Sequence, residues 1–199
     1  MKLRMKIIYP LFSFVMFLVC ACNNRKPEKQ TVTLLSDTSK FFPLPAFFKE
    51  QIQYVELRNF PLYKITVKDG IRDSSSLSFI QFKMLTSLFT SRDLSVPEIK
   101  ILYKESVFQD LSTGSITFNY NPTDNGAEVQ NIDILINEAT NQVKRVFIRA
   151  VYSKGDTTIT EQCNWKANKS FQINRSLTTV KGFTSTELNT INWNEKPYC

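Results

Sequence analysis

The chain of 199 residues contains no histidine. Histidine is the commonest metal ligand and general base in proteins, and it is the usual pH-sensitive side chain. Its absence excludes catalytic arrangements of the Ser-His-Asp and Cys-His types and zinc sites built on imidazole. Glycine is also scarce, with five residues in the chain, and no phosphate-binding loop or dinucleotide fingerprint is present. We therefore expect no cofactor and no metal.

The chain also lacks a large excess of charge. It has 25 Lys and Arg against 18 Asp and Glu, a net charge of +7. Three of the basic residues lie among the first 21 residues, and without that segment 22 basic residues stand against 18 acidic ones, a net charge of +4. The charges are scattered, whereas nucleic-acid binding requires a basic stripe or patch. We expect no nucleic-acid partner.

The first 21 residues have the pattern of a secretory signal peptide. Three basic residues precede an apolar run over residues 7–21, which ends at the small residue Ala21. The run is shorter than the ~20 residues that cross a membrane comfortably. A basic start, a short apolar segment and a small residue at its end are typical of secretory signals. We predict that residues 1–21 are removed, which leaves 178 of the 199 residues.

The sequence Val19-Cys20-Ala21-Cys22 resembles the lipobox of bacterial lipoproteins. The resemblance implies that Cys22 receives a diacylglycerol thioether, and that its amino group is acylated after cleavage behind Ala21. A thiolate is the nucleophile that this chemistry needs, and stable anchoring takes more than one acyl chain. Cys20 fits the motif less well, because bulky Val19 precedes it. The alternatives are a cleaved signal with an incidental cysteine and an uncleaved N-terminal anchor.

Residues 22–40 are predicted to be a lipidated polar tether, followed by a single domain over residues 41–199. This N-terminus is similar to those of Bacteroidota lipoproteins, whose surface-exported members often carry acidic residues just after the lipidated cysteine. Here Asn-Asn-Arg-Lys follows Cys22. The resemblance therefore implies a protein anchored in the outer membrane that faces the periplasm.

Periodicity predicts two helices, over Phe41–Asn59 and Asp73–Thr90. Apolar residues recur at helical spacing in both, and in the second helix the apolar stripe includes Ile80 and Met84. The Asp and Ser residues at the start of the second helix are its predicted N-cap, because their oxygens can accept from free N–H groups. A strand is expected between the helices, over Phe60–Val67.

After residue 99 the apolar residues recur with a period of two, which indicates β-strands. Turn residues separate short segments, and such a run favours an antiparallel meander. We predict an α+β fold, in which two N-terminal helices pack on a curved antiparallel meander sheet of about six strands. The expected strands are Ile101–Phe108, Ser115–Asn121, Val129–Asn137, Val143–Tyr152 and Thr157–Lys166, with further strand residues near Phe171 and Ile173 and over Leu188–Trp193.

Two cysteines lie in the predicted domain, Cys163 and Cys199. A disulfide between them is possible in the oxidising periplasm. The alternative is that Cys163 is a buried apolar residue and Cys199 a free thiol. A disulfide requires a short distance between the two Cα atoms, which the sequence does not give, so both alternatives stay open.

Two pairs of charged residues are candidates for chemistry. Glu105 and Asp110 flank a predicted hairpin, and paired carboxylates carry out acid–base chemistry in glycoside hydrolysis. Arg145 and Arg149 share one predicted strand face, and two guanidiniums can hold an anion. The alternative for both pairs is that they are solvated surface residues, with the arginine stems lying along apolar surface.

The sixteen phenylalanines either line a cup for an apolar ligand or fill an ordinary core. A helix over a curved sheet is similar to the half-barrel of periplasmic lipoprotein carriers. We expect a non-enzymatic protein that binds the membrane through its lipid anchor and binds envelope proteins or an apolar ligand through its domain. The alternative is a small carboxylate-dependent hydrolase.

Overall fold

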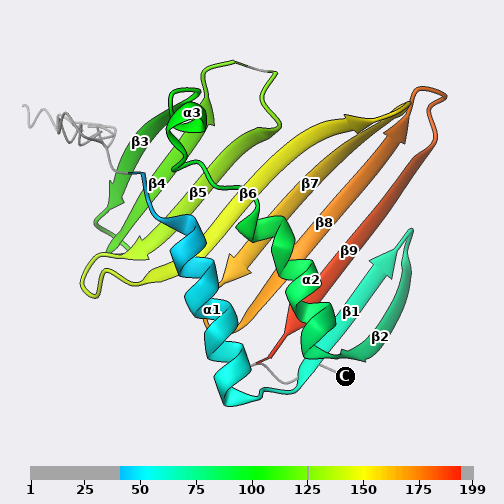
Figure 1. Ribbon diagram of the computed structural model, residues 1–199, viewed down its shortest axis with the longest axis horizontal. Coiled ribbons are helices and arrows are strands. Elements are labelled where there is room, and N and C mark those ends of the chain that lie inside the picture. The colour runs from blue at the N-terminus through cyan, green and yellow to red at the C-terminus, as the bar shows by residue number, and fades with distance from the viewer. Residues whose placement is uncertain (1–40, 125, 194–199) are drawn as a thin grey trace, which may run out of the picture.

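The computed structural model describes residues 41–124 and 126–193, which form a nine-stranded antiparallel sheet with helices on one face (Figure 1). The strand order is β2-β1-β9-β8-β7-β6-β5-β4-β3. Strands β3 to β9 follow one another as a meander, and the β1–β2 hairpin continues the sheet beside β9. The strands are β1 (Leu62–Lys68), β2 (Ile71–Leu77), β3 (Tyr103–Asp110), β4 (Ser115–Pro122), β5 (Val129–Asn137), β6 (Val143–Lys154), β7 (Thr157–Lys166), β8 (Ser170–Thr179) and β9 (Thr184–Asn192).

Three helices accompany the sheet in the described residues: α1 (Leu44–Arg58), α2 (Phe79–Thr90) and the single turn α3 (Pro97–Lys100). Helices α1 and α2 lie side by side across the middle of the sheet, and α3 lies near β3 and β4 (Figure 1). Pro45 lies in the first turn of α1, where its missing N–H would have no helical partner.

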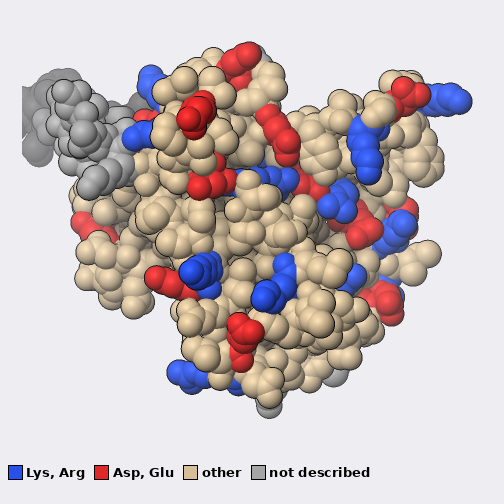
Figure 2. Space-filling model, in the orientation of Figure 1, with Lys and Arg blue, Asp and Glu red and all other residues tan. Residues whose placement is uncertain are grey.

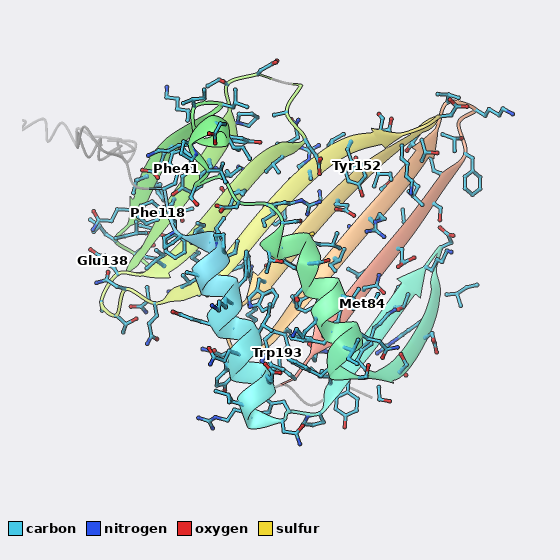
Figure 3. All side chains as sticks on the ribbon, viewed as in Figure 1. Phe41, Met84, Phe118, Glu138, Tyr152 and Trp193 are labelled. Atoms are coloured by element: carbon cyan, nitrogen blue, oxygen red, sulfur yellow. The ribbon has the colours of Figure 1, made fainter. Side chains whose placement is uncertain are left out.

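Aromatic side chains fill the space between the helices and the sheet. Phe48 of α1 and Phe89 of α2 contact Trp165 of β7, with ring centroids 5.3 and 5.0 Å apart. Phe171 of β8 stacks on the same indole at 5.0 Å, and Trp193 lies beneath α2 (Figure 3). These side chains are almost completely buried. They contact one another, so they pack as core and leave no cup among themselves.

The predicted arrangement of two helices on about six strands is wrong, because the sheet has nine strands and the described chain has a third short helix. Part of the error comes from β2, because its residues from Asp73 onward were predicted to begin the second helix. Gly70 (φ 86°) and Asp69 (φ 48°) make a tight turn, so the chain folds back on β1 and pairs with it. The antiparallel meander itself is confirmed.

The apolar stripe predicted for the second helix is only partly buried. Ile80 and Met84 are 74% and 69% exposed, whereas Phe82, Thr86 and Phe89 are buried. Helix α2 is apolar on most of its surface, so periodicity alone does not select one face. The aromatic face is the buried one, because Phe82 and Phe89 contact the rings of Phe171 and Trp165.

Candidate binding surface

The side of the sheet away from the helices is polar, and we call it the open face. Alternation along the strands produces it, because successive side chains point to opposite sides. In β7, Cys163 and Trp165 are buried beneath the helices, while Gln162, Asn164 and Lys166 point to the open face. The register places Gln172 of β8 and Thr190 of β9 in one row with Asn164, so amides and hydroxyls run across neighbouring strands.

A hollow of about 340 Å³ lies on the open face. Six neighbouring strands contribute to it, in the spatial order β2, β1, β9, β8, β7 and β6. Strands in a sheet are spaced about 4.8 Å apart, so a hollow that β2 and β6 both line extends across much of the open face. The lining residues are Ile65, Arg72, Arg145, Asn164, Lys166, Ser170, Gln172, Thr190 and Asn192.

The hollow is positively charged. Arg72 of β2, Arg145 of β6 and Lys166 of β7 contribute to its lining, and none of the described lining residues is Asp or Glu. Within residues 41–124 and 126–193, Arg72 and Arg145 form no ion pair. A guanidinium presents several N–H donors in a planar fork that matches a carboxylate or a phosphate. The hollow therefore offers two arginines to an anion.

The structure separates the two arginines that the sequence analysis paired. Arg145 lines the hollow, but Arg149 does not. Both belong to β6 and point to the open face, opposite Lys166 and Gln162 respectively. Four residues along a strand place their Cα atoms about 13 Å apart. Arg72, from a strand that sequence reasoning assigned to a helix, occupies the second arginine position of the hollow instead.

A buried ionic cluster lies on the other side of the sheet, beneath the segment that follows α2. Glu161 of β7 is fully buried and pairs with Arg92 and with Arg175 of β8. Its Oε1 accepts from Arg175 Nε at 2.9 Å and from the Tyr152 hydroxyl at 3.0 Å. Arg92 also donates to the Cys163 sulfur at 3.4 Å. Figure 3 shows Tyr152 on β6 near the upper end of the sheet.

The carboxylate of this cluster is held in its charged form. Burial alone favours the neutral acid, but hydrogen bonds from Arg92 and Arg175 outweigh it and lower the pKa of Glu161. Burial raises the pKa of the Cys163 thiol, which therefore stays protonated. A carboxylate whose oxygens already accept hydrogen bonds and a protonated thiol are poor catalysts. The cluster fastens the segment after α2 to the sheet.

Glu105 and Asp110 do not form a pair. They are five residues apart on β3, so their side chains point to opposite faces and their Cα atoms are about 17 Å apart. Glu105 lies on the helix side, opposite Tyr120 of β4. The Asp110 carboxylate accepts hydrogen bonds within its own turn, from the Ser112 N–H at 2.9 Å and from the Thr113 hydroxyl at 2.8 Å. Paired glycosidase carboxylates lie within about 10 Å of each other.

Cys163 is a free, buried thiol in the middle of β7. Its proposed disulfide partner Cys199 lies outside the described residues, as do Cys22, the predicted signal peptide and the tether over residues 22–40. Within the described ranges, no three Cys, Asp or Glu side chains gather as a metal site. No helix in the described part of the chain is long and apolar enough to cross a membrane.

Sequence reasoning missed Arg72, Arg92, Glu161 and Arg175. Glu161 carried a signal, because it falls in the same alternation as the buried residues Cys163 and Trp165. A charge in an apolar register indicates a buried partner. Comparison of the chain with protein-family models, with curated proteins and with solved structures finds no significant match.

Proposed function

We propose that this protein is a non-enzymatic binding module of the bacterial cell envelope, anchored through Cys22 to the outer membrane and facing the periplasm. Its hollow on the open face takes an anionic ligand. The observation that carries this proposal is the presence of Arg72 and Arg145 in one hollow without a described acidic partner. The lipobox resemblance of residues 19–22 supports the location.

The neighbours of the two arginines favour an acidic glycan as the ligand class. Asn164, Gln172 and Thr190 line the hollow between them, and amides and hydroxyls both donate and accept hydrogen bonds. Sugar hydroxyls need such groups, while a sugar carboxylate fits the guanidinium fork. The separation of Glu105 and Asp110 speaks against the hydrolase alternative, and the packed aromatic core speaks against an apolar ligand between helices and sheet. Binding of envelope proteins stays a prediction.

Calorimetric titration of the chain from residue 23 with trigalacturonate tests the hollow. All core residues of the described structure lie between Phe41 and Trp193, so this chain keeps them. We expect saturable binding that weakens as salt is added, because the contacts are ionic. Neutral maltotriose should bind at least about tenfold more weakly, because it lacks the carboxylates that the arginines hold.

The double variant Arg72→Gln/Arg145→Gln should weaken trigalacturonate binding by about tenfold or more, since charged hydrogen bonds contribute about 1.5–3 kcal/mol each. Arg149→Gln is the matched control, because Arg149 is an exposed arginine of the same face outside the hollow. Equal losses in both variants, or the absence of binding by the unaltered chain, would contradict the proposed site.

A further inference from the structure

The turn between β8 and β9 exposes two large apolar side chains. Val180 is 77% exposed and Phe183 is 65% exposed, with Lys181 and Gly182 between them. We call Val180 and Phe183 the apolar tip. Burial of apolar area away from water is favourable, so two large apolar side chains on one projecting turn form a surface that an apolar medium or a partner can cover. Figure 2 shows this hairpin as the corner that stands out at the upper right of the molecule.

Hydrogen bonds hold the apolar tip in place. The N–H of Thr179 donates to the carbonyl of Phe183, and the N–H of Gly182 donates to the carbonyl of Thr179, both at 2.9 Å. The N–H of Val180 donates to the carbonyl of Asp156 in the neighbouring β6–β7 turn at 3.0 Å. Gly182 has a φ of 81°, which favours glycine. The turn is thus ordered, and it presents its apolar side chains outward.

The described chain begins along the same edge of the molecule. Phe41 contacts Tyr120 near the end of β4, with ring centroids 4.7 Å apart. Strands β4, β6 and β8 run in the same direction, because neighbouring strands are antiparallel, so all three end at this edge. Figure 1 shows the start of the described chain at the left of the upper edge and the β8–β9 turn at its right.

The chain before Phe41 indicates what covers the apolar tip. Residues 23–40 separate Phe41 from Cys22 and span at most about 60 Å, so a lipid on Cys22 keeps the domain within about that distance of the bilayer. We propose that the apolar tip inserts into the surface of the membrane to which Cys22 is anchored. This inference rests on the proposed lipid anchor.

Fluorescence of the chain from residue 23 carrying Phe183→Trp tests the inference. Trp165 and Trp193 are buried at 0% and 3% exposure, so their emission provides a constant background. Excess vesicles of phosphatidylethanolamine and phosphatidylglycerol should shift the added emission to the blue, since the indole enters an apolar medium. Leu111→Trp is the control, because Leu111 is 78% exposed in the β3–β4 turn at the opposite strand end. Its emission should not shift.

Cosedimentation with the same vesicles gives a second readout. The double variant Val180→Ser/Phe183→Ser should bind at least about tenfold more weakly than the unaltered chain, whereas Leu111→Ser should bind equally well. An unshifted Phe183→Trp spectrum overturns the inference, and so does an equal shift in Leu111→Trp. Unchanged cosedimentation of the double variant also overturns it and leaves a protein as the partner. These samples lack Cys22, so a negative result concerns the apolar tip and not the anchor.

Discussion

Glu161 shows how a charged side chain can belong to a β-sheet core. It faces the helices from the middle of β7, and Arg92, Arg175 and Tyr152 donate to it. Arg92 comes from the segment that follows α2, so the pair joins that segment to the sheet. A buried ion pair is costly to break, because the partner that remains is an uncompensated charge.

We expect Glu161→Gln to lower the free energy of unfolding by about 3–5 kcal/mol, since it leaves buried Arg92 without its counter-charge. Urea denaturation followed by circular dichroism measures the change. Glu56→Gln is the control, because Glu56 is an exposed residue of α1. Its effect should stay within about 0.5 kcal/mol.

The stability difference between the unaltered protein and Glu161→Gln should depend on pH. The pKa of Glu161 is lowered in the fold from an ordinary value of 4.5. Its contribution is therefore complete above that value and is lost as the pH falls through the folded-state pKa. Denaturation at a series of pH values should show a constant difference at neutral pH that shrinks below about pH 4. A difference that persists unchanged in acid would contradict this role.

The candidate site could be predicted only in part from the sequence. The position of Arg145 could be predicted, because strict alternation in β6 assigns it to the polar face. The position of Arg72 could not be predicted, because Arg72 lies at the hollow only through pairing of β1 with both β2 and β9. Local periodicity contains no information on which distant strands become neighbours. The same holds for Arg92 and Arg175, which meet Glu161 from separate segments.

The β1–β2 hairpin is the element that periodicity could not identify. Strand β2 carries three consecutive serines and is exposed along most of its length, so no apolar alternation marks it as a strand. It forms an edge of the sheet, where polar residues discourage pairing with other chains. The Asp69-Gly70 pair at the end of β1 is a typical turn sequence, and it was the available signal that a second strand follows.

Ser78 decides where the hairpin ends and α2 begins. Its hydroxyl accepts from the N–H of Gln81, and the Gln81 side chain accepts from the N–H of Ser78 at 2.9 Å. We expect Ser78→Ala to lower the free energy of unfolding by about 1 kcal/mol, because both helix-capping bonds depend on this position. Thermal denaturation measures the change.

Ser74→Ala is the control for the cap. Ser74 is exposed in β2 and takes no part in helix capping. A loss as large in Ser74→Ala as in Ser78→Ala would show that the cap is not the cause. The sequence prediction placed the cap a few residues too early, within the serine run, because Ser and Asp are all suitable capping residues.

For the whole molecule, the meander was predictable because each of its hairpins joins consecutive strands through a short turn. Such pairings are local, and they follow from alternation and turn residues together. The position of β1 beside β9 joins two segments that are far apart in the chain and has no local signal. This closure adds two strands to the sheet and brings β2 to the hollow.

The proposed membrane attachment is tested on the full chain. We expect Cys22→Ser to move the protein from the membrane fraction to the soluble periplasmic fraction, because the substitution removes the acylated thiol. Fractionation of the producing bacterium, followed by immunoblotting, measures this. Cys20→Ser is the matched control, and it should leave the protein in the membrane. Retention of the Cys22→Ser protein would contradict the lipid anchor.

The length of β8 has a consequence for the ligand. Gln172 in the hollow and Val180 at the apolar tip are eight residues apart along this strand, a distance of about 26 Å. With the apolar tip in the bilayer, the strand acts as a spacer that holds the hollow about three Debye lengths above the lipid headgroups at physiological salt. Repulsion between an anionic membrane surface and an anionic ligand is largely screened at that height. If both proposals hold, the protein can stay attached to the membrane and still receive a ligand of the same charge.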